Sequence, residues 1–405
     1  MRRLASGSLL AGLIVVQALA GTAWAQHEEG GKAPSFSTTD LAQIPGKVRR
    51  VLFQAQQRRE AGESGEAVAL LRTYLSKHPE EDHPLLRFYL ASDLTLIGKQ
   101  REALAQLQAA VDMDPTFAHA WLSLGEVAYD LCQYGLAGKA FANGYEYSPA
   151  RHPGVLYYAT VSFLQAQEFD RALQLLTDLV SGNHGEPELD WYRALVSTCL
   201  DLNRTEQASR VADDMLRVHG DNPTAWKIVY QFAAAQGDYR RAAVALTVVG
   251  YLRPLRREEL SQLGDLYVLI DVPVQACRYY EQARPDSSSP RDYERLSSAY
   301  IAAHDAERAL HTLERALERK PTTRLWSLLA DLYYMQEDYE ESYRAFRECA
   351  RLDTTRARAH LMMGYCALEL GWVEEATQHL ERSAAFPELE EVSRELLNRA
   401  KAARR

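Results

Sequence analysis

The sequence lacks an excess of positive charge and the common catalytic motifs, and each absence argues against a class of function. Its formal net charge is −9 at pH 7. An acidic protein is poorly suited to binding nucleic acid, because a polyanion requires a basic surface. No glycine-rich phosphate loop, His-Glu-x-x-His pair or Gly-x-Ser-x-Gly motif is present. We therefore predict a protein that is not an enzyme and that uses no cofactor.

Cysteines are few and unpaired in sequence. The five are widely scattered, odd in number and include no Cys-x-x-Cys pair, which argues against both a zinc site and a disulfide scaffold. Cys349 and Cys366 lie on neighbouring predicted helices, and an oxidising compartment could join them in a disulfide.

Long apolar runs are also missing, except near the start of the chain. Arg2 and Arg3 precede an apolar stretch at 9–19, and Ala23-Trp24-Ala25 matches the small-x-small pattern that signal peptidase cleaves. We predict a signal peptide over 1–25, cleaved between Ala25 and Gln26, and export of a soluble protein to a bacterial periplasm. Residues 26–47 are predicted to form a flexible leader, and we expect no transmembrane segment in the mature chain.

What the sequence does contain is a repeated unit, of which residues 120–149, "AWLSLGEVAYDLCQYGLAGKAFANGYEYSP", are a clear copy. Each unit has two amphipathic helical patterns, and a small residue begins the second. We expect two helices to cross closely at that small residue. The small residue returns every 33 to 36 residues, at Ala67, Ala103, Ala137, Ala172, Ala208, Ala242, Ala276, Ala309, Ser342 and Ala376. Gly125 and Gly364 are likewise predicted where the partner helix comes near.

A period of about 34 residues with two helices resembles the tetratricopeptide repeat. The resemblance covers residues 48–386 and implies an all-α, right-handed superhelical solenoid of about ten helical hairpins. Because each hairpin needs a neighbour to bury its apolar faces, the amphipathic segment at 387–405 is predicted to be a C-terminal capping helix. The family resemblance also implies that the first helices line a concave groove that binds a protein or an extended peptide.

Three runs carry a narrower resemblance. They are the stretch at 120–149, "RPLRREELSQLGDLYVLIDVPVQACRYYEQA" and "ARAHLMMGYCALELG". They are similar to exported tetratricopeptide repeat proteins that accompany bacterial TonB–ExbB–ExbD energy-transduction systems. The resemblance implies an accessory role in that process. An adaptor in envelope or exopolysaccharide assembly or secretion, and a regulator of an envelope enzyme, are the alternatives.

The expected groove changes character along the chain. In the second to fourth units it is apolar and aromatic, and contiguous apolar surface is typical of partner sites. Farther on it is mixed and charged. The tentative partner-binding residues are Leu85, Phe88, Leu122, Tyr129, Tyr157 and Leu164. The alternative is that these side chains simply pack between neighbouring first helices.

Two other features receive structural interpretations. Family members that clamp the acidic C-terminus of chaperones use paired asparagines on the first helices, and the matching positions, such as Gln56, Ser92 and Glu126, hold no asparagine. His78 and His83 flank Glu80, Glu81 and Asp82. We interpret that segment as a solvated loop with a proline turn and predict no metal site.

Overall fold

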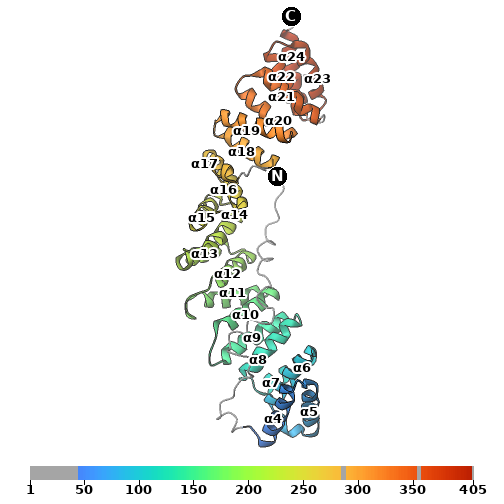
Figure 1. The fold of residues 1–405 in the computed structure, drawn as a ribbon, viewed down its shortest axis with the longest axis vertical. Helices are drawn as coiled ribbons and strands as arrows, with labels where there is room; N and C mark the ends of the chain where they lie inside the picture. Colours follow the sequence, from blue (N-terminus) through green and yellow to red (C-terminus); the bar gives the residue numbers. More distant parts are fainter. Residues whose placement is uncertain (1–43, 284–288, 354–356, 404–405) are drawn as a thin grey trace. The chain divides into compact units, whose positions relative to one another are not determined.

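The described part of the chain, residues 44–283, 289–353 and 357–403 of a computed structural model, is entirely α-helical between its turns. It contains 21 α-helices, one short 3₁₀ helix and no strand (Figure 1). The predicted signal peptide, its cleavage site at Ala25 and Gln26, and the leader as far as residue 43 lie outside the described residues. The all-α repeat fold predicted from the sequence is confirmed.

Consecutive helices form two compact units, divided between Gly220 and Asp221. The first unit contains α4 (Gly46–Glu60), α5 (Ser64–Lys77), η1 (Pro79–Glu81), α6 (Pro84–Leu96), α7 (Gln100–Met113), α8 (Ala118–Asp130), α9 (Tyr134–Tyr147), α10 (Pro153–Gln165), α11 (Phe169–Leu179), α12 (Leu189–Asp201) and α13 (Thr205–His219).

The second unit contains α14 (Pro223–Ala235), α15 (Tyr239–Leu252), α16 (Arg257–Leu269), α17 (Pro273–Ala283), α18 (Pro290–Ala302), α19 (Ala306–Arg319), α20 (Thr323–Met335), α21 (Tyr339–Leu352), α22 (Ala357–Glu369), α23 (Val373–Ala384) and α24 (Glu390–Ala403). The even-numbered helices from α4 to α22 are the first helices of the hairpins. No helix in the described part combines the length and the apolar character needed to cross a bilayer.

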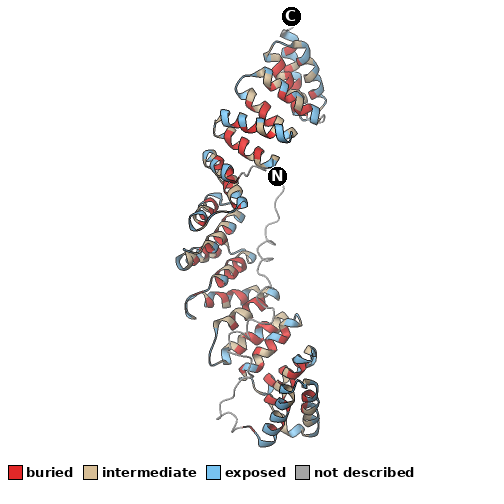
Figure 2. Cartoon of the chain, viewed as in Figure 1, coloured by how far each residue is buried: buried red, intermediate tan, exposed pale blue. Residues whose placement is uncertain are grey.

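The small residues that set the repeat period lie where the helices of a hairpin cross. All ten, from Ala67 to Ala376, have no exposed surface, which confirms the prediction. The glycine prediction is also confirmed: a Cβ on Gly125 would lie 2.8 Å from the Phe141 ring, and one on Gly364 would lie 2.6 Å from Leu380 Cγ. Helix contact at these points therefore requires small side chains. Figure 2 shows buried residues along the helices of each unit.

A left-handed residue joins the two helices of every hairpin. Gly98 has φ 76° and Gly237 has φ 77°. The same conformation occurs without glycine at Cys132, Gln167, Asn203, Asp271, His304 and Glu337. An L-residue in this region costs about 1–2 kcal/mol, so packing of the two helices imposes the turn at these sites.

The two ends of the array differ slightly from the expected bounds. Gly46 and Lys47, predicted to belong to the leader, begin α4. At the other end α24 packs against α23, and the buried Ser383 and Ser393 hydroxyls are 2.7 Å apart.

The cysteines on α21 and α22 are free thiols. Cys349 donates to the Thr323 carbonyl at 3.6 Å, and Cys366 donates to Ser342 Oγ at 3.4 Å. Each sulfur therefore has its own hydrogen-bond acceptor, and the disulfide that the sequence left open is not formed.

Candidate functional site

The six predicted groove residues divide into two groups. Leu85, Phe88 and Leu122 are only 8%, 7% and 8% exposed. The Phe88 ring lies 5.2 Å from the ring of Phe117, and Leu122 packs closely enough on Gly144 that a Cβ there would lie 2.6 Å from it. These three side chains are therefore buried by packing, which is the alternative that the sequence left open.

Tyr129, Tyr157 and Leu164 are half-buried and therefore present part of their surface to solvent. Tyr129 and Leu164 pack on the apolar cluster formed by α8–α11. Burial, with the nearby Asp190 carboxylate, raises the pKa of Tyr157 to about 12, so its hydroxyl remains neutral and can donate a hydrogen bond. These three residues are the ones that a partner can reach.

A recess of about 250 Å³ forms where α10 meets α12. Leu164 and Phe169 contribute its apolar surface, and Asp201 lies at the end of α12 beside them. The Thr198 hydroxyl in the same recess is already bonded to the Ala194 carbonyl at 2.8 Å. The recess thus offers an apolar surface with a carboxylate at its rim. Its other lining residues are Val161, Gln165, Gln167 and Ser197.

The Asp201 carboxylate has no hydrogen bond or ion pair within the described residues, and partial burial raises its pKa. The sequence analysis missed this residue. The repeat register contains a signal for it, because Asp201 stands before Ala208 as Gln165 stands before Ala172. A carboxylate without a partner beside apolar surface is suited to a basic or hydrogen-bond-donating side chain.

Glu126 is a second carboxylate on this surface. It lies on α8 between Leu122 and Tyr129, at spacings that place all three on one helix face. Its side chain is accessible to solvent. The surrounding protein, which limits its hydration, and the Asp130 carboxylate together raise the pKa of Glu126 to about 7.

In the second unit several charges on the first helices are already paired. Asp265 accepts hydrogen bonds from Tyr280 at 2.6 Å and from Arg295 at 2.9 Å. Arg358 pairs with Asp331 at 2.7 Å. A recess of about 490 Å³ that includes Asp265 and Arg295 is therefore polar but largely self-neutralised. The mixed, charged surface expected from the sequence is present here.

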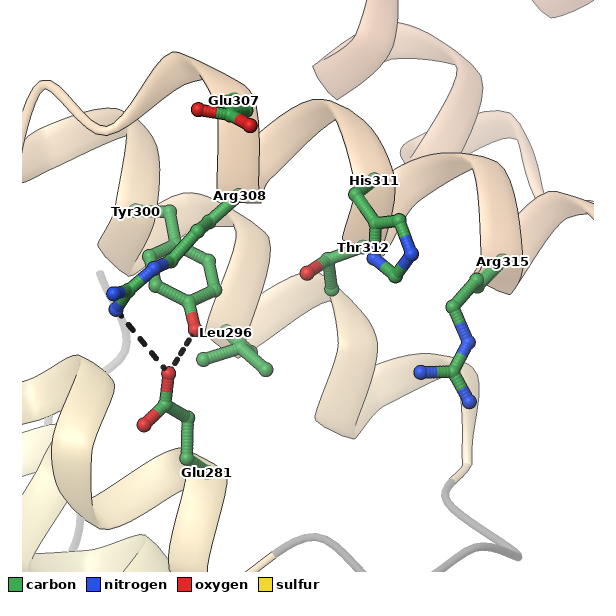
Figure 3. Close-up of a pocket in the computed structure, with 8 residues that line it drawn as sticks. All are labelled: Glu281, Leu296, Tyr300, Glu307, Arg308, His311, Thr312 and Arg315. Carbon is green, nitrogen blue, oxygen red and sulfur yellow. Dashed lines mark hydrogen bonds and ion pairs between the residues drawn. The ribbon is translucent and has the colours of Figure 1, made fainter.

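Another pocket in this unit, of about 410 Å³, lies between α17, α18 and α19. Figure 3 shows Arg308 and Tyr300 converging on the carboxylate of Glu281. Tyr300 donates a hydrogen bond to that carboxylate, and the Arg308 guanidinium is 3.7 Å from it. The Glu281 carboxylate in this pocket is therefore neutralised by its own neighbours.

The segment with histidines and acids forms an exposed turn at η1. The possible ligand atoms of His78, Glu80 and Glu81 lie within 4.8 Å of one another. Glu81 is already paired with Lys47 at 2.6 Å and accepts a hydrogen bond from Tyr74. His83 accepts a hydrogen bond from the backbone of Leu85 at 3.2 Å, as the cap of α6. Capping and surface pairing account for these side chains.

Comparison with known proteins supports the repeat assignment. Residues 97–154 and 295–357 match the family model of the tetratricopeptide repeat. No curated protein matches the sequence significantly.

Several solved structures match the chain at low identity and with low TM-scores. The MamA protein is 21% identical over 42% of this chain and 94% of its own, with a TM-score of 0.38. A tetratricopeptide repeat protein from Parabacteroides merdae is 13% identical over 62% and 98%, with a TM-score of 0.35. Yeast Tom70 is 13% identical over 88% and 96%, with a TM-score of 0.34.

Proposed function

We propose that this chain, which belongs to the tetratricopeptide repeat family, is a non-enzymatic scaffold that binds an extended segment of a partner protein. The binding surface consists of the exposed faces of α8, α10 and α12. Tyr129, Tyr157 and Leu164 supply its apolar contacts, and Glu126 and Asp201 supply its charge.

The observation that carries the proposal is the recess between α10 and α12. Leu164 and Phe169 can receive an apolar side chain or the aliphatic stem of a lysine or arginine, and Asp201 lies at the rim to pair with its charge. Half-buried aromatic and aliphatic side chains act as anchors when a partner completes their burial. The partner segment therefore carries apolar side chains interspersed with basic ones.

The sequence supports a periplasmic location for this scaffold. Arg2 and Arg3, the apolar stretch and Ala23-Trp24-Ala25 have the order of a signal peptide. On this proposal the partner is a protein or peptide of the bacterial envelope, and an accessory role in TonB-dependent energy transduction is the most specific version. Mass spectrometry of the protein from an envelope fraction tests the predicted cleavage. A mature N-terminus upstream of Gln26 would refute it. Genes for exopolysaccharide synthesis beside this one would favour the adaptor alternative.

The binding surface is tested with a displayed peptide library selected on the chain from residue 26 onward. We expect peptides that combine aromatic or aliphatic residues with arginine or lysine. For one selected peptide, Leu164→Ala and Asp201→Asn should each weaken binding by about tenfold, since each removes about 1–2 kcal/mol of contact.

Tyr251→Ala serves as the matched control, because this tyrosine is 85% exposed on a second helix and lies outside the proposed surface. It should leave the affinity unchanged. Selected peptides that lack basic residues, or affinities unaffected by Leu164→Ala and Asp201→Asn, would remove this surface from consideration.

A further inference from the structure

A second pocket, far from α8–α12 in the sequence, has a different chemistry. It has a volume of about 630 Å³ and lies between α21, α22 and α23. Met363, Ala350, Ala385 and Phe386 give it an apolar portion. Its polar portion contains three arginines and two histidines, a concentration of cationic and hydrogen-bonding groups that the interaction surface proposed above does not use.

The two histidines replace residues that pack the cleft in other hairpins. His360 occupies the register position held by Trp121, Trp226, Tyr293 and Trp326 in other first helices. His379 on α23 occupies the position held by Ala345 on α21. Imidazoles thus stand where the named hairpins have a bulky aromatic side chain or an alanine.

The histidines form a hydrogen-bonded chain with a tyrosine. The Nδ1 atoms of His360 and His379 are 3.3 Å apart, whereas the ring centroids are 5.5 Å apart, so the rings meet through their Nδ1 edges. The hydroxyl of Tyr343 lies 3.0 Å from Nε2 of His379. One Nδ1 must carry a hydrogen and the other must accept it. Two imidazolium ions cannot keep this contact, because both nitrogens would then be donors.

Some of the arginines around these hydrogen-bonded side chains have no acidic partner in the described part of the protein. Arg351 is paired with Glu348 at 2.7 Å. Arg347 on α21 and Arg382 on α23 form no ion pair within the described residues and line the pocket. Burial and the nearby Arg382 lower the pKa of His360, and burial, His360 and Arg382 lower that of His379 to about 4. Both rings are therefore neutral at pH 7 although Glu375 lies nearby.

We propose that this pocket binds a phosphate group, either as the free ion or at the end of a small organic molecule. Arg347 and Arg382 supply the charged donors, for which the planar guanidinium is well matched to phosphate oxygens. His360 supplies a further ring N–H from the hydrogen-bonded chain. The apolar portion accommodates the organic part of a phosphate monoester.

Binding of phosphate is coupled to proton uptake by the histidine pair. Burial and the positive charge of Arg382 keep the rings neutral when no anion is bound, and a bound dianion offsets that charge. The pKa of His379 therefore rises toward its ordinary value when phosphate binds. The other titratable or charged groups that face the pair are Tyr343, Glu348, Arg351 and Glu375.

The test is calorimetric titration of the chain from residue 26 onward with inorganic phosphate and, separately, with phenyl phosphate. We expect saturable binding of one equivalent. The dissociation constant, expressed for the concentration of the dianion at each pH, should be lower at pH 6 than at pH 8. Tighter binding of phenyl phosphate than of phosphate would identify an organic ligand, and the reverse would identify the free ion. Arg347→Gln and Arg382→Gln should each weaken binding about 10- to 100-fold.

Arg344→Gln is the matched control. This arginine lies on the same helix but pairs with Glu340 and Glu341, away from the pocket. It should bind phosphate as the unaltered chain does. Titration of the histidine ring protons by NMR gives an independent readout, and the His379 signal should titrate at higher pH with phosphate present.

Two results would overturn the proposal. One is that neither compound binds saturably at concentrations up to about 10 mM. The other is binding that Arg347→Gln and Arg382→Gln leave unchanged. Neither result would bear on the surface formed by α8, α10 and α12, so failure here is distinguishable from failure of the proposed scaffold function.

Discussion

The two units are built from the same hairpin but differ in whether particular acids on their first helices are paired. In the first unit Glu126 and Asp201 lie beside half-buried Tyr129 and Leu164 without an ion-pair partner in the described residues. In the second unit Asp265 is bonded to both Tyr280 and Arg295. A partner gains more binding free energy from a charged side chain without an ion pair, because no existing pair must be broken first. One repeat scaffold can therefore carry some acids that are available to a partner protein and others that are bonded within the protein.

The buried ion pairs of the two units also differ, in how fully the acid is compensated. In the first unit Arg59 donates to Asp93 at 2.6 and 3.2 Å and lies over the Tyr89 ring. Burial raises the pKa of Asp93, although Arg59 acts against that change. In the second unit Glu259 receives two bonds of 2.7 Å from Arg253.

Further donors reach Glu259 from Lys227 at 3.3 Å and from the backbone of Arg256 at 3.0 Å. The hydrogen bond from Arg253 is the largest of the effects that lower the pKa of Glu259 to about 2. The charged form of Glu259 therefore stabilises its unit, whereas the charged form of Asp93 is only partly compensated.

The largest expected effect comes from neutralising Glu259, with Asp93 as the comparison. Glu259→Gln should lower the free energy of unfolding at pH 7 on the order of 3 kcal/mol, the equivalent of moving its pKa from an ordinary value to about 2. Asp93→Asn should cost about 1 kcal/mol, because its neutral form is already favoured by burial. Urea unfolding followed by circular dichroism measures both.

The pH dependence of the Glu259 effect provides an internal check. Because the folded pKa is lowered, the stabilisation is present above the ordinary pKa and is lost as the pH falls through about 2. The difference between the unaltered chain and Glu259→Gln should therefore shrink between pH 4.5 and 2. For Asp93, whose pKa is raised, stabilisation is instead lost as the pH rises. Equal costs for the two substitutions at pH 7 would contradict the contrast between the units.

Substitution of the glycines at close helix contacts should affect both units alike. Gly125→Ala in the first unit and Gly364→Ala in the second should each destabilise by about 1–3 kcal/mol, because the added methyl group meets Phe141 or Leu380. Gly65→Ala is the control, since nothing lies within 4 Å of a Cβ at that position. Thermal unfolding would show the effect. A neutral result at Gly125 would mean that α8 and α9 separate at little cost.

The smallest expected effect concerns the turns within hairpins. Gln167→Gly and Glu337→Gly should each stabilise by about 0.5–1 kcal/mol, since φ is 60° and 63° at these residues. Gly98→Ala, at φ 76°, should destabilise by about 1 kcal/mol. Denaturant midpoints of the three variants measure these changes. A gain in only one of the two units would show that the turn is not an equivalent element throughout the array.

The sequence predicted the features that depend on local spacing. Ala137 and Gly125 identify a close helix contact because small residues at that spacing serve no other purpose, and the structure confirms both. It also predicted apolar residues on the first helices of the first unit. It did not separate Leu122 from Tyr129, because both occupy the same helix face and differ only in what the neighbouring helix covers.

The sequence by itself determined the helical hairpin and its repetition, because the period of apolar and small residues is encoded within each 34-residue stretch. Only the tertiary structure decided which side chains remain available. Whether Asp201 is alone or Asp265 is paired depends on the side chains that adjacent hairpins bring near it. Those contacts join residues about 15 to 30 positions apart, as with Tyr280 and Arg295 around Asp265. A periodicity read along one helix contains no information about them.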